Sequence, residues 1–192
     1  ISSNRKKSKN VIFIYIGRLL KDKGLIELYE AMNSLKNNFQ HVHLNILGIV
    51  DPDNPSALSS TQILDFRNHP KITLINEVDD IRPYLTNSDC LILPSYREGL
   101  PRSVLEAMSM EIPVIASNVP GCSTLVKDGF NGFLFEARSS NSLCATMEKF
   151  ISINAEERRQ LGKNGREMIE KNYSVSIVVQ SLIDIINNLK ND

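Results

Sequence analysis

The sequence predicts an α/β fold: a Rossmann-like parallel sheet of about six strands with helices on both faces. Apolar, β-branched runs alternate along the chain with segments of helical periodicity, which is the order of repeated strand-helix-strand units. The runs are nearly continuously apolar, as is typical of parallel strands covered on both faces. A purely helical stretch follows the last run, so a helical C-terminal tail is also expected.

Each expected strand is a short apolar run bounded by turn or polar residues. The six runs span residues 11–16, 42–47, 72–75, 90–93, 113–116 and 132–135. Apolar side chains at three- and four-residue steps predict crossover helices between the strands and further helices in the tail. These helices are expected at 25–35, 59–66, 81–85, 102–110, 143–151, 156–170 and 175–189.

Composition limits the classes of function. The 192 residues are 42% hydrophobic and 23% charged, which is typical of a globular protein with a buried core. The 22 basic residues equal the 22 acidic residues in number, so no field over the whole chain attracts nucleic acid or an anionic membrane. Any phosphate binding must be local, and no nucleic-acid partner is expected.

Cysteine usage and hydropathy bear on location and domain organisation. Cys90, Cys122 and Cys144 give no Cys-x-x-Cys pair, which favours a reducing compartment, and the cytoplasm is the expected location. The longest apolar run is far shorter than the roughly 20 residues of a transmembrane helix, so no membrane span is expected. The polar, basic segment 1–10 is expected to be a linker, followed over 11–192 by one domain of a longer protein.

Ligands of open α/β sheets bind beyond the carboxyl ends of the strands, so residues that follow a strand are the first candidates. The first strand is followed by Gly17, Arg18, Lys23 and Gly24, just before a helix. Glycine permits close backbone approach, and two flexible cations beside a helix N-terminus can hold a diphosphate. The alternative is a solvated turn with incidental charges. The segment lacks the ending of a P-loop and the three-glycine dinucleotide motif.

The loop after the fourth strand carries the second candidate. Glu98 and Glu106 are separated by seven residues, and Pro101 suits the first turn of a helix. Glu98 is therefore expected in the loop and Glu106 inside the helix, near exposed backbone N–H groups that can hold phosphate. Carboxylates there can accept hydrogen bonds from sugar hydroxyls. The alternative is a surface loop carboxylate together with a Glu106 that pairs with Arg102, four residues earlier.

Metal binding is the third possibility. Asp51 and Asp53 form an Asp-x-Asp pair of the kind that can hold a divalent cation against a sugar nucleotide. Two prolines and an asparagine beside them favour a turn instead. The histidines have no ligand spacing with a cysteine, and Cys122, expected in a loop, has no identified base and is interpreted as structural. We therefore predict no metal site and no cofactor.

The two candidate loops belong to a longer series of motifs. The series is Gly17-Arg18, Lys23-Gly24, Leu47-Gly48, Val78-Asp79-Asp80, Asp89, Leu93-Pro94-Ser95, Glu98 with Glu106, Ala107-Met108, Pro113-Val114-Ile115-Ala116, Val119-Pro120-Gly121-Cys122 and Asp128-Gly129-Phe130-Asn131-Gly132. In this order the motifs cover about residues 11–136 and resemble the retaining GT-B glycosyltransferases of the group-one family, with its Glu-x7-Glu motif. The resemblance is to the C-terminal, nucleotide-sugar-binding half of that fold, so the N-terminal acceptor domain is expected to lie outside this chain.

The resemblance implies a role for each candidate. Arg18 and Lys23, with Gly17 beside them, are expected to hold the donor diphosphate. Glu106 is expected to bind the ribose hydroxyls, and Glu98 to contact the transferred sugar. Of these, Glu98, Arg18 and Lys23 are the expected catalytic residues.

The resemblance also implies contacts from two loops. The backbone of the segment before and inside the fourth crossover helix is expected to complete the donor site, through Gly99, Leu100, Pro101, Arg102, Ser103 and Val104. The base is expected against the loop that contains Asn76 and Val78. The family often has glycine where this chain has Asn76 and Glu111. Asn76 tolerates left-handed backbone, whereas Glu111 leaves the helix end without its usual terminator.

The implied function is retaining transfer of a sugar from a nucleotide sugar, expected to be a UDP-sugar, to a surface polysaccharide or lipid-linked glycan. No metal is required, because Arg18 and Lys23 are expected to stabilise the departing diphosphate. The isolated chain is expected to be inactive, and the full-length protein to lie at the inner face of the cell membrane. The alternatives are a noncatalytic nucleotide-sugar-binding module and a GT-B sugar-nucleotide epimerase.

Overall fold

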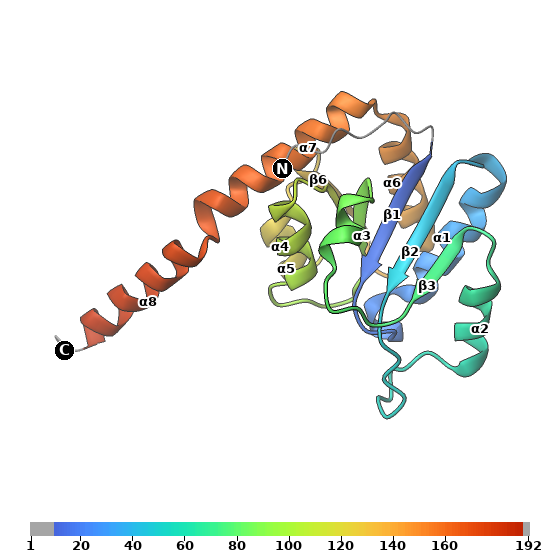
Figure 1. The fold of residues 1–192 in the computed structure, drawn as a ribbon, viewed down its shortest axis with the longest axis horizontal. Helices are drawn as coiled ribbons and strands as arrows, with labels where there is room; N and C mark the ends of the chain where they lie inside the picture. The colour runs from blue at the N-terminus through green and yellow to red at the C-terminus, as the bar shows by residue number, and fades with distance from the viewer. Residues whose placement is uncertain (1–9, 190–192) are drawn as a thin grey trace.

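The structure is a computed structural model that describes residues 10–189. Residues 1–9, most of the expected linker, lie outside the described part of the chain. Within residues 10–189 the chain forms a six-stranded sheet in the order β3-β2-β1-β4-β5-β6, and every neighbouring pair of strands is parallel. This arrangement confirms the α/β fold that the sequence predicts (Figure 1).

The strands lie where the apolar runs predict them. They are β1 (Val11–Ile16), β2 (Val42–Leu47), β3 (Ile72–Ile75), β4 (Cys90–Leu93), β5 (Val114–Ser117) and β6 (Gly132–Phe135). Only β5 differs, since it begins and ends one residue later than expected. Pro113 has no N–H to give to a strand ladder, and it contributes only its carbonyl, which accepts a hydrogen bond from the Leu91 N–H over 2.9 Å.

The expected helices form to within three residues at each end. They are α1 (Leu25–Asn38), α2 (Ser60–Asn68), α3 (Arg82–Thr86), α4 (Arg102–Ser109), α6 (Ser140–Ser152), α7 (Ala155–Asn172) and α8 (Val175–Leu189). The sequence does not predict two short elements, the 3-10 turn η1 (Lys21–Lys23) and α5 (Pro120–Leu125). The expectation of a loop at Cys122 is therefore wrong. The segment opens with Pro120-Gly121, a pair typical of turns, and the clearest helical signal for α5 is Pro120 at its first position.

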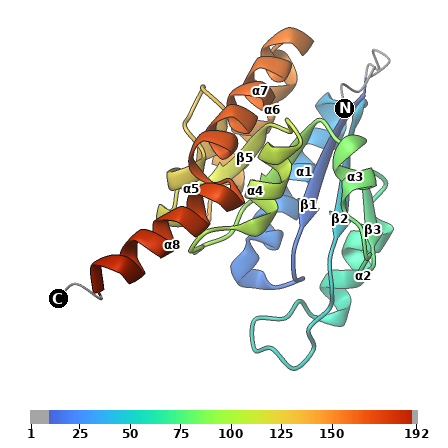
Figure 2. The same cartoon turned by 60° about the vertical axis from the view of Figure 1, so that its left-hand side comes forward.

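Helices cover both faces of the sheet. α1 and α6 pack against each other on one face, and α4 and α7 pack against each other on the other (Figures 1 and 2). The centre of β1 is fully buried between these layers, with the Phe13 ring centroid 5.8 Å from that of Phe150 in α6. Burial of two aromatic rings from strand and helix fixes the position of β1, and hence of the residues that follow its carboxyl end.

The C-terminal helix α8 extends away from the sheet (Figure 2). Several of its large apolar side chains are exposed, including Val175, Ile185 and Ile186. Within residues 10–189, the structure contains no helix with both the length and the hydropathy needed to cross a membrane.

Candidate donor-binding site

Arg18, Lys23 and Glu98 lie where the strand order changes direction. β1 to β3 build the sheet outward on one side and β4 to β6 on the other, so β1 and β4 are neighbours whose crossovers depart in opposite directions. The loops that leave the carboxyl ends of such a pair open a crevice between them. The turn that carries Arg18 and Lys23 follows β1, and the loop that carries Glu98 follows β4.

The turn after β1 packs directly on the loop after β4. Gly24 has a left-handed φ of 69°, and a Cβ at this position would lie 2.0 Å from the Pro94 carbonyl oxygen. In the same contact, the Tyr96 N–H donates to the Asp22 carbonyl over 2.9 Å. Glycine is thus required at position 24 both by conformation and by space. The close approach sets the Lys23 side chain against the β4 loop.

Lys23 and Glu98 form an ion pair across this contact. The Lys23 Nζ lies 2.7 Å from Glu98 Oε1, and the two side chains are only 21% and 14% exposed. The start of α5 packs directly against the backbone of Glu98, because a Cβ on Gly121 would lie 2.2 Å from the Glu98 carbonyl oxygen. Two of the three expected catalytic residues are therefore in direct contact.

The third, Arg18, lies in the same cleft but pairs elsewhere. A cleft of about 470 Å³ is lined by Arg18, Asp22, Lys23, Tyr96, Arg97 and Arg138. The Arg18 Nη1 lies 3.2 Å from Asp51 Oδ2, with side chains 56% and 32% exposed. An exposed pair of this kind is worth about 0–1 kcal/mol, so water or an anion can replace the carboxylate. Asp51 thus supplies a side chain to the cationic turn.

Tyr15 holds the backbone of Arg18 from below. Its fully buried hydroxyl donates to the Arg18 carbonyl over 2.8 Å. Burial, with a smaller contribution from the Glu98 and Asp22 carboxylates, raises the pKa of Tyr15, so the phenol stays neutral and remains a donor. Gly17 leaves no room for a side chain beside this hydroxyl, because a Cβ there would lie 2.8 Å from the Tyr15 oxygen.

The segment before α4 can contact a ligand through its backbone N–H groups rather than through its side chains. Pro101 and Val104 are buried in the core, whereas Gly99 and Leu100 are exposed beside the cleft-lining residues 96 and 97. Ser103 is half-buried in the first turn of α4. Because the first backbone N–H groups of a helix have no partner within it, this turn can donate to an anion.

Glu106 lies one turn into α4. The Glu106 Oε1 lies 3.5 Å from Arg102 Nη2, and the side chains are 38% and 89% exposed. The pairing with Arg102 that the sequence leaves open is therefore present. Its arginine precedes its glutamate by four residues, the weaker order on a helix, so the contact adds at most a few tenths of a kcal/mol. The carboxylate remains available to a ligand.

The loop after β3 lies beside the loops after β1 and β2. The Gly48 N–H donates to the Ile75 carbonyl over 3.1 Å, and a Cβ on Gly48 would lie 2.4 Å from the Gly17 carbonyl oxygen. Asn76 is exposed and Val78 half-buried in this loop. The suggested left-handed backbone at Asn76 is not found: among described non-glycine residues, positive φ occurs at Glu111 and at Arg138.

Glu111 ends α4 in the conformation that glycine usually supplies there. Its φ is 59°, and Gly162 of α7 approaches so closely that a Cβ on it would lie 2.1 Å from the Glu111 carbonyl oxygen. The tight packing of α7 on this corner holds a conformation that costs a side-chain-bearing residue about 1–2 kcal/mol. The expectation that Glu111 leaves the helix end without a terminator is therefore wrong, because Glu111 itself adopts the left-handed conformation.

Asp51, Asp53 and Cys122 are the remaining candidates from the sequence, and Asp51 reaches the cleft through its ion pair with Arg18. Asp51 and Asp53 lie in a turn in which the Asn54 N–H donates to the Asp51 carbonyl over 3.1 Å. Among the described residues, no three His, Cys, Asp or Glu side chains are grouped as metal ligands. Cys122 is fully buried, and burial together with the Glu98 charge raises its pKa to about 11. A thiol of that pKa is a poor nucleophile.

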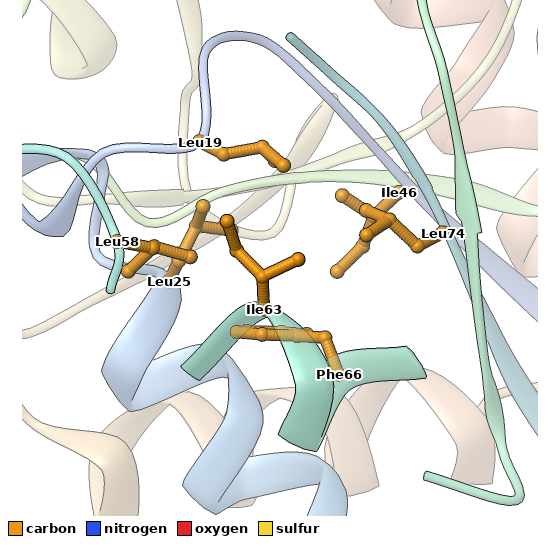
Figure 3. Close-up of a pocket in the computed structure, with 7 residues that line it drawn as sticks. All are labelled: Leu19, Leu25, Ile46, Leu58, Ile63, Phe66 and Leu74. Atoms are coloured by element: carbon orange, nitrogen blue, oxygen red, sulfur yellow. The ribbon is translucent and has the colours of Figure 1, made fainter. Parts of the chain in front are cut away.

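A second pocket lies under α2 and is entirely apolar. Figure 3 shows it between α2 and the sheet, lined by Leu19, Leu25, Ile46, Leu58, Ile63, Phe66 and Leu74. It has no room for a water molecule and no polar lining. It is a packing gap of the core rather than a ligand site.

Four residues that line the cleft are not predicted from the sequence: Asp22, Tyr96, Arg97 and Arg138. Asp51 is likewise not predicted as the partner of Arg18. A usable signal exists for each of them, because Asp22 follows β1, Asp51 follows β2, Tyr96 and Arg97 follow β4, and Arg138 follows β6. All five therefore lie beyond a carboxyl end of the parallel sheet, where ligands bind.

Known proteins resemble this chain in sequence. A family model described as glycosyl transferases group 1 matches residues 1–168. The capsular polysaccharide biosynthesis glycosyltransferase CapM of Staphylococcus aureus is 29% identical over 93% of this chain and 46% of its own length. The Escherichia coli UDP-Gal:alpha-D-GlcNAc-diphosphoundecaprenol alpha-1,3-galactosyltransferase is 28% identical over 95% of this chain and 48% of its own. This chain thus spans about half the length of the curated relatives it matches.

Solved structures share the fold. The crystal structure of Anabaena HepE in complex with UDP-glucose superposes with a TM-score of 0.82 at 20% identity, over 93% of this chain and 49% of that one. The Rossmann-like sheet with its helical tail is therefore one half of a GT-B fold, as expected. Since the family model covers residues 1–168 of 192, the chain belongs to the glycosyl transferases group 1 family.

Proposed function

We propose that this chain is the donor-binding domain of a retaining glycosyltransferase and binds a UDP-sugar without metal. The observation that carries the proposal is the contact between Lys23 Nζ and Glu98 Oε1 at 2.7 Å. In a nucleotide sugar the transferred sugar is bonded directly to the second phosphate. A cation for that phosphate and a carboxylate for that sugar must therefore be adjacent, and these two groups touch.

The ribose and base assignments rest on the family to which the chain belongs, because Glu106, Asn76 and Val78 are not among the residues that line the cleft. We assign the diphosphate to Arg18 and Lys23, which lie beside Gly17, and the ribose to Glu106. The base is assigned to the loop of Asn76 and Val78. The N–H groups of Arg102 and Ser103, in the first turn of α4, suit the phosphates. Pro101 has no N–H, and the Val104 N–H donates to the Pro101 carbonyl over 3.2 Å.

The proposed chemistry needs charge stabilisation at two places. Transfer of the sugar develops positive charge at the anomeric carbon and negative charge on the departing diphosphate. Arg18 and Lys23, already fixed in the cleft, oppose the negative charge as the bond to the sugar breaks. The Glu98 carboxylate lies where it can orient the sugar and face the positive charge. In this account the acceptor attacks on the face that the diphosphate leaves, which retains the anomeric configuration.

The choice of UDP and of the acceptor class is supported by the relatives. HepE is solved with UDP-glucose, and the E. coli relative is named for a UDP-Gal donor and a diphosphoundecaprenol-linked acceptor. CapM is named for capsular polysaccharide biosynthesis. We infer a surface polysaccharide or lipid-linked glycan as acceptor, at the cytoplasmic face of the membrane. An acceptor domain outside residues 11–192 is part of this proposal, so the chain alone is proposed to bind donor and not to transfer it.

The test is an assay of the longer protein with a panel of labelled UDP-sugars and a lipid-diphosphate-linked sugar acceptor. Transfer of label to the acceptor, with the anomeric configuration of the donor kept in the product by NMR, is the expected result. Isomerisation of the UDP-sugar without transfer would identify an epimerase instead. Nucleotide binding without either reaction would identify a noncatalytic module.

A further inference from the structure

The cleft holds more positive charge than the proposed donor contacts use. Its lining includes Arg18, Lys23, Arg97 and Arg138. Arg18 and Lys23 pair with carboxylates, whereas Arg97 and Arg138 form no ion pair with any residue of the described chain. The one acidic lining residue, Asp22, accepts a hydrogen bond at Oδ1 from Ser56 Oγ over 3.1 Å. Arg97 and Arg138 therefore face the cleft without an ion-pair partner within residues 10–189, and four cations line it with one carboxylate, Asp22.

Tyr96 is a fixed platform for one of these arginines. Its backbone N–H donates to the Asp22 carbonyl over 2.9 Å, and its hydroxyl donates to Glu27 Oε1 over 2.7 Å. Partial burial and the bond to Glu27 raise the pKa of Tyr96 to about 12, so the hydroxyl keeps its proton at physiological pH. Held at both ends, the ring has a defined orientation at the cleft wall.

Arg138 stacks on that platform. Its guanidinium carbon lies 4.4 Å from the centroid of the Tyr96 ring. Its backbone is left-handed, with φ of 65°, a conformation that glycine adopts more easily than arginine. Stacking occupies the face of the guanidinium and leaves its N–H edge, which matches two oxygens of a phosphate, for a ligand.

We propose that Arg97 and Arg138 form a second phosphate subsite, filled together with the donor diphosphate that Arg18 and Lys23 are proposed to hold. The inference rests on the proposed function and names the substrate chemistry: the acceptor carries a phosphate or diphosphate close to the sugar that is extended. The two pairs of cations come from different segments of the cleft wall, the turn after β1 for one and the loops after β4 and β6 for the other. A single diphosphate does not need all four.

The test is calorimetric titration of inorganic pyrophosphate into the 192-residue chain in EDTA with UDP at saturation. Pyrophosphate is expected to bind with UDP in place. Arg138→Gly and Arg97→Ala are each expected to weaken pyrophosphate about tenfold or more, with UDP affinity changed less than twofold. Arg138→Gly keeps the left-handed backbone without strain, and Arg138→Lys, which keeps charge but not the paired N–H edge, should fall between. Arg159→Ala, which removes a cation of α7 outside the cleft, is the matched control and should change neither affinity.

Several results would overturn the subsite. They are absence of pyrophosphate binding, displacement of pyrophosphate by UDP, unchanged affinity in both variants, or an equal loss of UDP affinity in Arg138→Gly. The last would place Arg138 in the donor site. Normal UDP binding with any of these results removes this inference alone, whereas a chain that fails to bind UDP contradicts the proposed function as well.

A parallel titration with geranyl diphosphate separates two sources of the phosphate. Affinity equal to or above that of pyrophosphate, lost in the same two variants, indicates a lipid-linked diphosphate. Affinity at least tenfold weaker indicates a phosphate carried on the glycan itself. Both outcomes support the subsite, and binding that survives both substitutions contradicts it.

Discussion

Lys23 and Glu98 are separated by 75 positions in the chain, yet Lys23 Nζ donates to Glu98 Oε1 over 2.7 Å in a largely buried contact. The pair joins the turn after β1 to the loop after β4. An ammonium group has three N–H donors, so Lys23 can keep its bond to Glu98 and also donate to a phosphate. The contact therefore orients both side chains before any ligand binds.

The two cations are expected to act on the phosphates and not on the base. Lys23→Ala should weaken UDP binding by about 1.5–3 kcal/mol, the usual range for a charged hydrogen bond, and uridine binding much less. Arg18→Ala should weaken UDP by less, because its side chain is 56% exposed. Calorimetry with UDP and uridine measures both. Lys21→Ala, a neighbouring cation that does not line the cleft, serves as control, and equal losses for uridine and UDP would contradict the assignment.

Replacement of Glu106 and replacement of Glu98 are expected to have different effects on UDP binding and on catalysis. Glu106→Gln should weaken UDP itself, because a neutral amide accepts hydrogen bonds from ribose less strongly than a carboxylate. Glu98→Gln should leave UDP affinity nearly unchanged and lower kcat/KM for the UDP-sugar in the longer protein, since its contact is to the transferring sugar. Circular dichroism first establishes that both variants fold. Abolished UDP binding in folded Glu98→Gln, with Glu106→Gln unaffected, would reverse the two roles.

Gly24 is expected to be a structural requirement of the site. Gly24→Ala places a Cβ 2.0 Å from the Pro94 carbonyl oxygen in a left-handed conformation, and should destabilise the fold by more than about 3 kcal/mol. Gly129 is the matched control, because its φ of 72° is similar but a Cβ there meets no atom within 4 Å. Gly129→Ala should cost only the conformational term of about 1–2 kcal/mol. Urea unfolding of both variants measures the difference, and equal losses would show that the contact with Pro94 is unimportant.

The buried thiol of Cys122 makes stability depend on alkaline pH. Its pKa is raised to about 11 in the folded chain, mainly by burial, so the unfolded chain loses this proton at lower pH than the folded chain does. In this pH interval the folded state binds more protons than the unfolded state, so the contribution of Cys122 to stability falls as pH rises from about 9 toward 11. In urea unfolding, Cys122→Ala should show a shallower loss of stability over this interval than the unaltered chain. Parallel pH profiles would contradict the assigned shift.

Much of the fold can be predicted from the sequence because its strands are apolar runs of parallel-sheet type. The bounds of β1 and α8, for example, agree with the expected ones. α5 is not found this way, since it opens with Pro120-Gly121, a pair that favours a turn. The left-handed backbone falls on Glu111 rather than Asn76, because α7 packs on the end of α4 through Gly162. That contact joins residues distant in sequence and leaves no local signal.

The site is predictable in part for the same reason. Residues that follow strands converge at one edge of a parallel sheet, so the nearness of Lys23 and Glu98 can be expected from the order of elements. The pairing of Arg18 with Asp51 and the stacking of Arg138 on Tyr96 depend on side-chain positions that the strand pattern does not specify. These contacts decide which cations in the cleft are neutralised and which face a ligand.

The most direct test is calorimetric titration of UDP and of uridine into the 192-residue chain in EDTA. UDP is expected to bind without metal, with a Kd of order 10 μM to 1 mM, about 4–7 kcal/mol, and uridine much more weakly. The prediction rests on the cations of the cleft, Arg18 and Lys23, and on the start of α4 as the phosphate site. UDP binding that occurs only with added Mg²⁺ or Mn²⁺, or uridine that binds as tightly as UDP, would contradict it.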